Sequence, residues 1–177
     1  FLHGVEVVEI DNGPRPIRTV RSSIIGLIGT APDADADAFP LNVPKLVAGN
    51  RTEAAKLGAT GTLPTAIDAI FDQAGAMVVV IRIEEGADEA ETIGNAVGGV
   101  DIDTGQYEGV HAFLGAESVV HVSPRVLIAP GFTHQRPDGN ANPVISELVG
   151  IAELLRAVII ADAPNTNDAD AITYRED

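Results

Sequence analysis

The feature that most constrains the fold is a series of short, nearly continuous apolar runs that begins at Ser23. Five such runs occur, rich in Val and Ile and bounded by turn-forming residues: SIIGLIGT, KLVAG, MVVVIRI, PRVLIAP and AVIIADA. Strands that read as unbroken apolar runs are typical of a sheet that is covered on both faces. We therefore expect these five runs to form the strands of a buried sheet.

Two stretches between the runs have helical spacing. Apolar residues recur at intervals of three and four over residues 65–73 and again over residues 143–156, as they do in amphipathic helices. Strands that alternate with helices favour crossover connections. The pattern predicts an α/β fold of the doubly wound type, with a mixed, mostly parallel sheet and helices on both faces. The last stretch, APNTNDADAITYRED, predicts a capped loop and the start of another helix.

The first 17 residues follow a different pattern. Apolar and acidic residues interleave from Val5 to Ile10, and the sequence NGPRP then breaks the strand. A lone strand is not stable in water, so the segment needs a partner strand. We predict an extended N-terminal arm over residues 1–17, followed by one α/β domain over residues 18–177. A frayed terminus, or pairing within the same subunit, remains an alternative for the arm.

Charge and composition argue against several classes of function. The net charge is −15, from 26 acidic and 11 basic residues, which disfavours binding to nucleic-acid phosphates and docking on an anionic membrane. The longest apolar runs are far shorter than the roughly 20 residues that span a bilayer. The chain contains no cysteine, which excludes disulfides and thiolate catalysis. We also expect no signal peptide, and a few residues before Phe1.

Three aspartates alternate in the acidic sequence DADADA. Asp33, Asp35 and Asp37 resemble the opening of a calcium loop, in which alternate carboxylates converge on one cation. However, Ala38 stands where such a loop needs Gly, and Pro44 stands where it needs Glu. We expect a solvated acidic loop.

Other motifs for catalysis or metal binding are weak. Asp103-Thr104-Gly105 matches the tripeptide of aspartic proteases, but those enzymes use two copies, and the surrounding residues favour a turn. The four histidines have no metal-binding spacing: His3, His111, His121 and His134. No G-x-S-x-G motif is present. We expect neither a metal nor another cofactor.

Three residues stand at the predicted carboxyl ends of strands, where open α/β sheets usually hold ligands: Thr30, Gly131 and Asp162. Gly26 and Gly29 resemble the glycines that let a backbone approach a phosphate, but their spacing fits neither G-x-G-x-x-G nor G-x-x-x-x-G-K-[ST]. A doubly wound enzyme with a nucleotide or another small molecule at these strand ends therefore stays open as an alternative, beside ordinary strand-to-helix turns.

Four separated blocks resemble, in order, the contractile tail sheath proteins of phages and R-type pyocins. They are the opening FLHGVEVVEIDNGPRPI, the strand-helix-strand unit from NVPKLVAG through GTLPTAIDAIFDQ to VVVIRIEEG, and the later segments PRVLIAPGFTHQ and LLRAVIIADAPNT. The resemblance extends from Phe1 to about Tyr174. It implies the N-terminal part of a sheath protein, without the C-terminal domain and arm of that family.

The resemblance implies a structural subunit and no enzyme. Such subunits polymerise with copies of themselves in stacked rings around an inner tail tube, with the baseplate and tail terminator at the ends, and contract to drive the tube through a target envelope. The particle would be a virion tail or a phage-tail-like device, assembled in the host bacterial cytoplasm. A baseplate interaction module is a further alternative.

The same resemblance implies that the N-terminal arm adds a strand to a sheet shared with neighbouring subunits. We therefore predict a subunit contact at the apolar residues of the arm, Val5, Val7, Val8 and Ile10. We predict that Gly13, Pro14 and Pro16 form the hinge between the arm and the body of the subunit.

Overall fold

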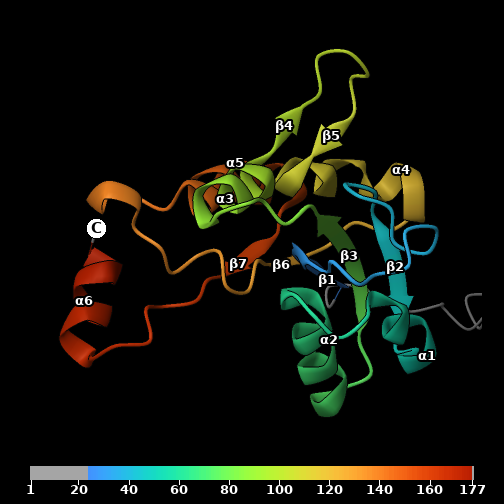
Figure 1. The fold of residues 1–177 in the computed structure, drawn as a ribbon, viewed down its shortest axis with the longest axis horizontal. Coiled ribbons are helices and arrows are strands. Elements are labelled where there is room, and N and C mark those ends of the chain that lie inside the picture. The colour runs from blue at the N-terminus through green and yellow to red at the C-terminus, as the bar shows by residue number, and fades with distance from the viewer. Residues whose placement is uncertain (1–23, 177) are drawn as a thin grey trace, which may run out of the picture.

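The computed structural model describes residues 24–176 and contains one five-stranded sheet with helices on both faces (Figure 1). Strand β1, Ile24–Thr30, lies at the centre, between β3, Met77–Ile83, and β6, Val126–Ile128, and is parallel to both. Strand β7, Val158–Ile160, pairs with β6 in parallel, and β2, Lys45–Ala48, pairs with β3 in the antiparallel sense. The sheet order is β2-β3-β1-β6-β7.

All five apolar runs are therefore strands of a single mixed, mostly parallel sheet, and the predicted fold class is confirmed. The boundary expected between an arm at residues 1–17 and the domain falls outside the described residues, so this division stays a prediction.

One face of the sheet is covered by the elements between β2 and β3: α1, Arg51–Ala54, the 3-10 turn η1, Ala55–Leu57, and α2, Thr62–Gln73. Leu27 and Val80 of the sheet pack there against Leu57, Leu63 and Ile67, and all five are fully buried or nearly so. The first predicted helix segment, 65–73, lies inside α2, which begins three residues earlier than expected.

The opposite face is covered by α3, Glu89–Val97, by the long 3-10 segment η2, Gly109–Gly115, and by α5, Pro143–Leu155. Ile28, Ile81 and Leu127 pack there against Phe113 and Leu148. Figure 1 shows α3 and α5 on one side of the sheet and α2 on the other. The helix predicted over residues 143–156 is α5, which ends one residue earlier because Arg156 adopts a left-handed conformation.

Smaller elements lie outside these layers. Strands β4, Gly99–Val100, and β5, Tyr107–Glu108, form a hairpin that projects from the α3 side of the molecule (Figure 1). The short helix α4, Ala116–Val120, follows η2, and the 3-10 turn η3, Pro137–Gly139, precedes α5. The predicted final helix is α6, Asp168–Glu176.

Helix α6 is attached to the loop that follows β6. The Arg136 guanidinium lies over the Tyr174 ring, 4.6 Å from its centre, and donates a hydrogen bond to the Tyr174 carbonyl. The Tyr174 hydroxyl donates to the Thr133 carbonyl, and burial raises the pKa of that hydroxyl. These contacts hold α6 beside the loop at residues 131–136.

Candidate assembly surfaces

The predicted contact residues of the arm lie outside the described residues. Val5, Val7, Val8 and Ile10, and the hinge at Gly13, Pro14 and Pro16, precede Ile24, where the described chain begins. Their roles in a subunit contact and in a joint stay predictions.

The structure places the three strand-end residues of the alternative ligand site at one end of the sheet. The amide of Gly131 donates to Oδ2 of Asp162 at 2.7 Å, and the amide of Asp162 donates to the hydroxyl of Thr133 at 2.7 Å. Thr30 lies at the same end of the sheet, because the parallel strands β1, β6 and β7 all end there. The side chain of Asp162 therefore joins the loops that follow β6 and β7.

Thr30 is engaged with α2. Its amide donates to Oγ1 of Thr62 at 3.1 Å, while its own Oγ1 accepts from the Thr62 amide at 3.3 Å. Gly61, just before the helix, has φ +91, and a Cβ there would stand 2.4 Å from the Thr30 carbonyl oxygen. The polar groups of Thr30 thus fasten a strand end to a helix, as expected for an ordinary strand-to-helix turn.

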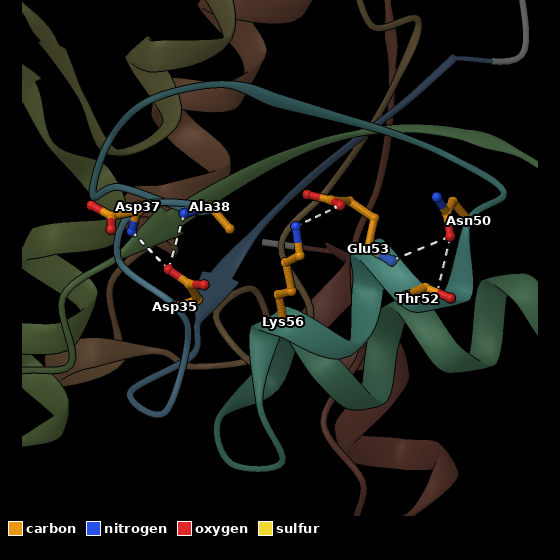
Figure 2. Close-up of polar contacts among 7 residues, drawn as sticks. All are labelled: Asp35, Asp37, Ala38, Asn50, Thr52, Glu53 and Lys56. Carbon is orange, nitrogen blue, oxygen red and sulfur yellow. Dashed lines mark hydrogen bonds and ion pairs between the residues drawn. The ribbon is translucent and has the colours of Figure 1, made fainter.

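The acidic loop uses its carboxylates to hold its own backbone (Figure 2). Oδ1 of Asp35 accepts from the amides of Asp37 and Ala38, and Oδ2 of Asp33 accepts from the Thr60 hydroxyl at 2.6 Å. The aspartates therefore serve different segments instead of converging on one point. Within residues 24–176, no three His, Asp or Glu side chains gather closely enough to hold a metal ion.

A second set of polar contacts lies in α1 and η1, next to the acidic loop (Figure 2). The Asn50 side chain caps α1 by accepting from the amides of Thr52 and Glu53. Lys56 pairs with Glu53 at 2.9 Å, and the hydrogen bond to that carboxylate raises the pKa of the lysine. The Lys56 carbonyl accepts from the Asp35 amide at 2.9 Å. These contacts attach the acidic loop to the helices beside it.

The protease-like tripeptide forms the turn of the β4–β5 hairpin. Oδ1 of Asp101 accepts from the amides of Asp103 at 2.7 Å and Thr104 at 2.9 Å, and these bonds, Thr104 first, lower the pKa of Asp101. The Gly105 amide closes the turn on the Asp101 carbonyl at 2.8 Å, with φ +70 at Gly105. Asp103 is exposed at this turn. The tripeptide therefore forms a hairpin turn, as the surrounding residues favoured.

The histidines in the described chain lie in separate places. His111 of η2 pairs with Glu147 of α5 through Nε2 at 3.3 Å, and His121 ends α4 in a left-handed conformation with φ +59. His134 lies in the loop between β6 and η3. His3 precedes the described residues.

The hairpin exposes apolar side chains that the sequence reasoning did not single out. Ile102 at the turn is 96% exposed, and Val100 and Tyr107 on the two strands are exposed as well. A groove at its base is lined in part by Val119 and Pro44. The sequence predicted only a turn here. The alternation of Val100 and Ile102 with aspartates, next to the DTG turn, is the signal that could have identified a hairpin with an apolar edge.

A second exposed apolar surface lies on β7, an edge strand of the five-stranded sheet. Val158 and Ile160 of β7 are 60% and 61% exposed, whereas the intervening Ile159 packs on the core under α5. Val158 pairs with Val126, and Ile160 pairs with Ile128. We call this surface the β6–β7 face: Val126, Ile128, Val158 and Ile160.

Residues 22–83 match a family model described as the tail sheath protein Gp18 domain III N-terminal region. This span contains β1, β2, α1, α2 and β3, which are the central strands and the helices of one face. Similarity to named proteins extends much further along the chain.

The tail sheath protein of Escherichia phage P2 is 40% identical over 163 residues, which cover 89% of this chain and 39% of that protein. The major tail sheath protein of Serratia phage KSP20 is 36% identical, over 99% of this chain and 44% of that protein. The chain belongs to the phage tail sheath family. A putative prophage major tail sheath protein of Pseudomonas aeruginosa strain UCBPP-PA14 is 35% identical, over 98% of this chain and 43% of its own length.

The chain spans about two fifths of the length of these tail sheath relatives. The family model and these relatives confirm, at the level of the family, the resemblance that four sequence blocks indicated. No helix in the described part of this tail sheath sequence is long and apolar enough to cross a membrane.

Proposed function

We propose that the chain forms part of a structural subunit of a contractile tail sheath. The subunit polymerises in stacked rings around an inner tail tube, meets the baseplate and tail terminator at its ends, and contracts to drive the tube through the target envelope. The observation that carries this proposal is the similarity to named tail sheath proteins along nearly the whole chain, from 89% to 99% of its length in three relatives.

The packing of the described domain fits the role of a rigid building block. Both faces of the sheet bear clusters of fully buried side chains, and the Thr30–Thr62 and Gly131–Asp162 bonds fasten the strand ends to neighbouring elements. Packed cores resist gradual deformation. We therefore infer that contraction moves whole domains against one another, with the work supplied by two alternative packings of the same subunits.

Subunit association would begin at the N-terminal arm. Val5, Val7, Val8 and Ile10 would add a strand to the sheet of a neighbour, since backbone hydrogen bonds in such additions give affinity and alternate side chains give register. Gly13, Pro14 and Pro16 would let the arm turn relative to the domain. The net charge of −15 would limit association before assembly, because like charges repel at low ionic strength.

The test is to express the complete open reading frame that encodes this chain and to image the product by negative-stain electron microscopy. We expect hollow tubes or stacked rings. A variant that lacks residues 1–10 should stay folded, with an unchanged far-UV circular dichroism spectrum, but should form no tubes. A product that stays monomeric at all concentrations would contradict the proposed sheath function. Tubes that form equally well without residues 1–10 would contradict the proposed role of the arm.

A thermal-shift screen against nucleotides, flavins and divalent cations provides the matching control for the alternative enzyme. A ligand that stabilises the protein, with the shift abolished by Asp162→Ala, would favour a binding site at the strand ends over a purely structural role.

A further inference from the structure

We propose that the β4–β5 hairpin of one subunit docks on the β6–β7 face of a second copy in the assembled sheath. The occupant of that face is thus the hairpin of a neighbouring subunit, with Ile102 as the anchoring side chain. The proposal rests on the sheath function proposed above and adds the pair of surfaces that meet.

The hairpin is a preorganised element that presents one apolar side chain. Ile102 lies between Asp101 and Asp103, and the Asp101 carboxylate fixes the turn through two amides. The Asp101 amide donates to the Gln106 carbonyl at 2.9 Å, which closes the other side of the loop. A rigid turn that holds an isoleucine almost fully in water loses little conformational freedom when it binds.

The β6–β7 face is the uncovered half of an otherwise buried surface. Paired residues on parallel strands share a face, and the register places Leu27 beside both Val80 and Ile128, with Ile160 beside Ile128. Along this row Val80 and Leu27 are fully buried under α2, Ile128 is half-buried, and Ile160 is 61% exposed. The cover that α2 gives to β1 and β3 therefore ends before β7.

The next helix along the chain does not restore this cover. Helix α6 follows β7 but is held beside residues 131–136 by Arg136 and Tyr174, and its sequence DADAITYRE is mostly polar. The side chain of Ile172 in α6 is itself 52% exposed. No helix among residues 24–176 therefore covers Val158 and Ile160.

The charges of the two surfaces are complementary. The 42 residues between Arg82 and Arg125 contain no Lys or Arg, and the hairpin within them carries Asp101, Asp103 and Glu108. By contrast, Arg125 and Arg156 stand at the amino ends of the adjacent strands β6 and β7. Arg125 is half-buried and donates to the Leu155 carbonyl, whereas Arg156 is exposed. An acidic hairpin would be attracted to this basic edge, although two copies of so acidic a chain repel one another overall.

The two surfaces lie on opposite sides of the sheet. The hairpin extends from the side of α3 and η2, whereas the β6–β7 face continues the side covered by α2 (Figure 1). A contact between two different patches is heterologous, so it repeats from copy to copy and builds rings or helical stacks. One such contact is small and weak, and it gains strength only when many subunits are held together.

These 177 residues contain no cysteine, and any cysteine elsewhere in the complete open-reading-frame product is replaced by serine before the cross-linking test. Single variants Ile102→Cys and Ile160→Cys are mixed, assembled and oxidised, and the mixed disulfide is measured by mass spectrometry. Ile102→Cys with Ile172→Cys is the matched control, since residue 172 is exposed to a similar degree. We expect the 102–160 disulfide to form about tenfold faster than the 102–172 disulfide, because docking raises the effective concentration.

A second variant separates this contact from folding. Ile102→Asp should keep the thermal midpoint of the monomer and lose tube formation, whereas Ile102→Leu should assemble normally. Equal cross-linking rates, or tubes from Ile102→Asp, would overturn the proposal while the sheath function stands. Protection of the thiol in the unassembled Ile160→Cys variant from maleimide would also overturn it, because the face would then be covered by the same polypeptide. If the unmodified protein forms no tubes, both proposals fail.

Discussion

The reciprocal bonds between Thr30 and Thr62 allow a defined test of how the strand end is held. Oγ1 of Thr62 accepts from the Thr30 amide at 3.1 Å, and Thr30 is only 4% exposed. The substitution Thr62→Val keeps the branched shape of the side chain and removes the acceptor. Water has little access to the amide that is left, so the amide loses its partner without a replacement.

A buried amide without a partner costs about 1–3 kcal/mol. The shape of the side chain is unchanged, so no cavity adds to this cost. In a domain of this size each kcal/mol lowers the thermal midpoint by about 2–4 °C, which predicts a decrease of about 2–12 °C. The free energy of unfolding should be measured by urea denaturation followed by far-UV circular dichroism, with the slope m unchanged.

Two control variants bracket the effect. Thr62→Ser keeps the hydroxyl and should stay close to the unmodified protein, whereas Thr60→Val removes an exposed hydroxyl that donates to Asp33 at 2.6 Å and should cost about 1 kcal/mol or less. The reasoning would be refuted if Thr62→Val were as stable as Thr62→Ser, or if Thr60→Val cost more than Thr62→Val.

Three further predictions concern other parts of the domain. Asn142→Ala should destabilise by more than about 2 kcal/mol in urea denaturation, because the buried amide caps α5 at Ile145 and donates to two loop carbonyls; a loss below about 1 kcal/mol would contradict this. Gly98→Ala should disorder the base of the hairpin, since its φ is +61 and a Cβ would stand 2.2 Å from the Glu108 carbonyl oxygen; unchanged amide shifts for the hairpin in NMR spectra would argue against it. The bonds to the Asp101 carboxylate should persist above its ordinary pKa of 3.8 and be lost as the pH falls through a lower folded value; amide shifts of residues 103 and 104 that titrate at or above 3.8 would exclude the mechanism.

The sheet was predictable because its strands leave a one-dimensional signal. Runs such as MVVVIRI are apolar on both faces, and the structure buries them on both. The helices α2 and α5 were equally visible from their spacing. The start of α2 at Thr62 was not predicted, because Thr62 is fixed by Thr30 from 32 residues away and not by its neighbours in sequence.

The surfaces were harder to predict than the core. Helix α3 carries a start signal, Asp88 with Glu91 three residues later, and the Asp88 side chain accepts from the Glu91 amide at 2.8 Å. This short helix of nine residues was nevertheless not predicted from the sequence. The exposure of Val158 and Ile160 could not be predicted at all, because AVIIADA looks the same whether one face or both are covered. That difference depends on where α2 ends over the sheet.

The order of the strands also determines how long one edge of the central strand lacks its partner while the chain is being synthesised. Strand β1 is the first described strand and lies at the centre, but its β6 edge has no partner until synthesis has passed from Ile83 to Ile128, a further 45 residues (128 − 83). At synthesis rates of about 5–20 residues per second, this takes roughly 2–9 s. During that interval the apolar edge IIGLIGT is open to other nascent chains, so chaperone capacity should limit the yield of folded protein.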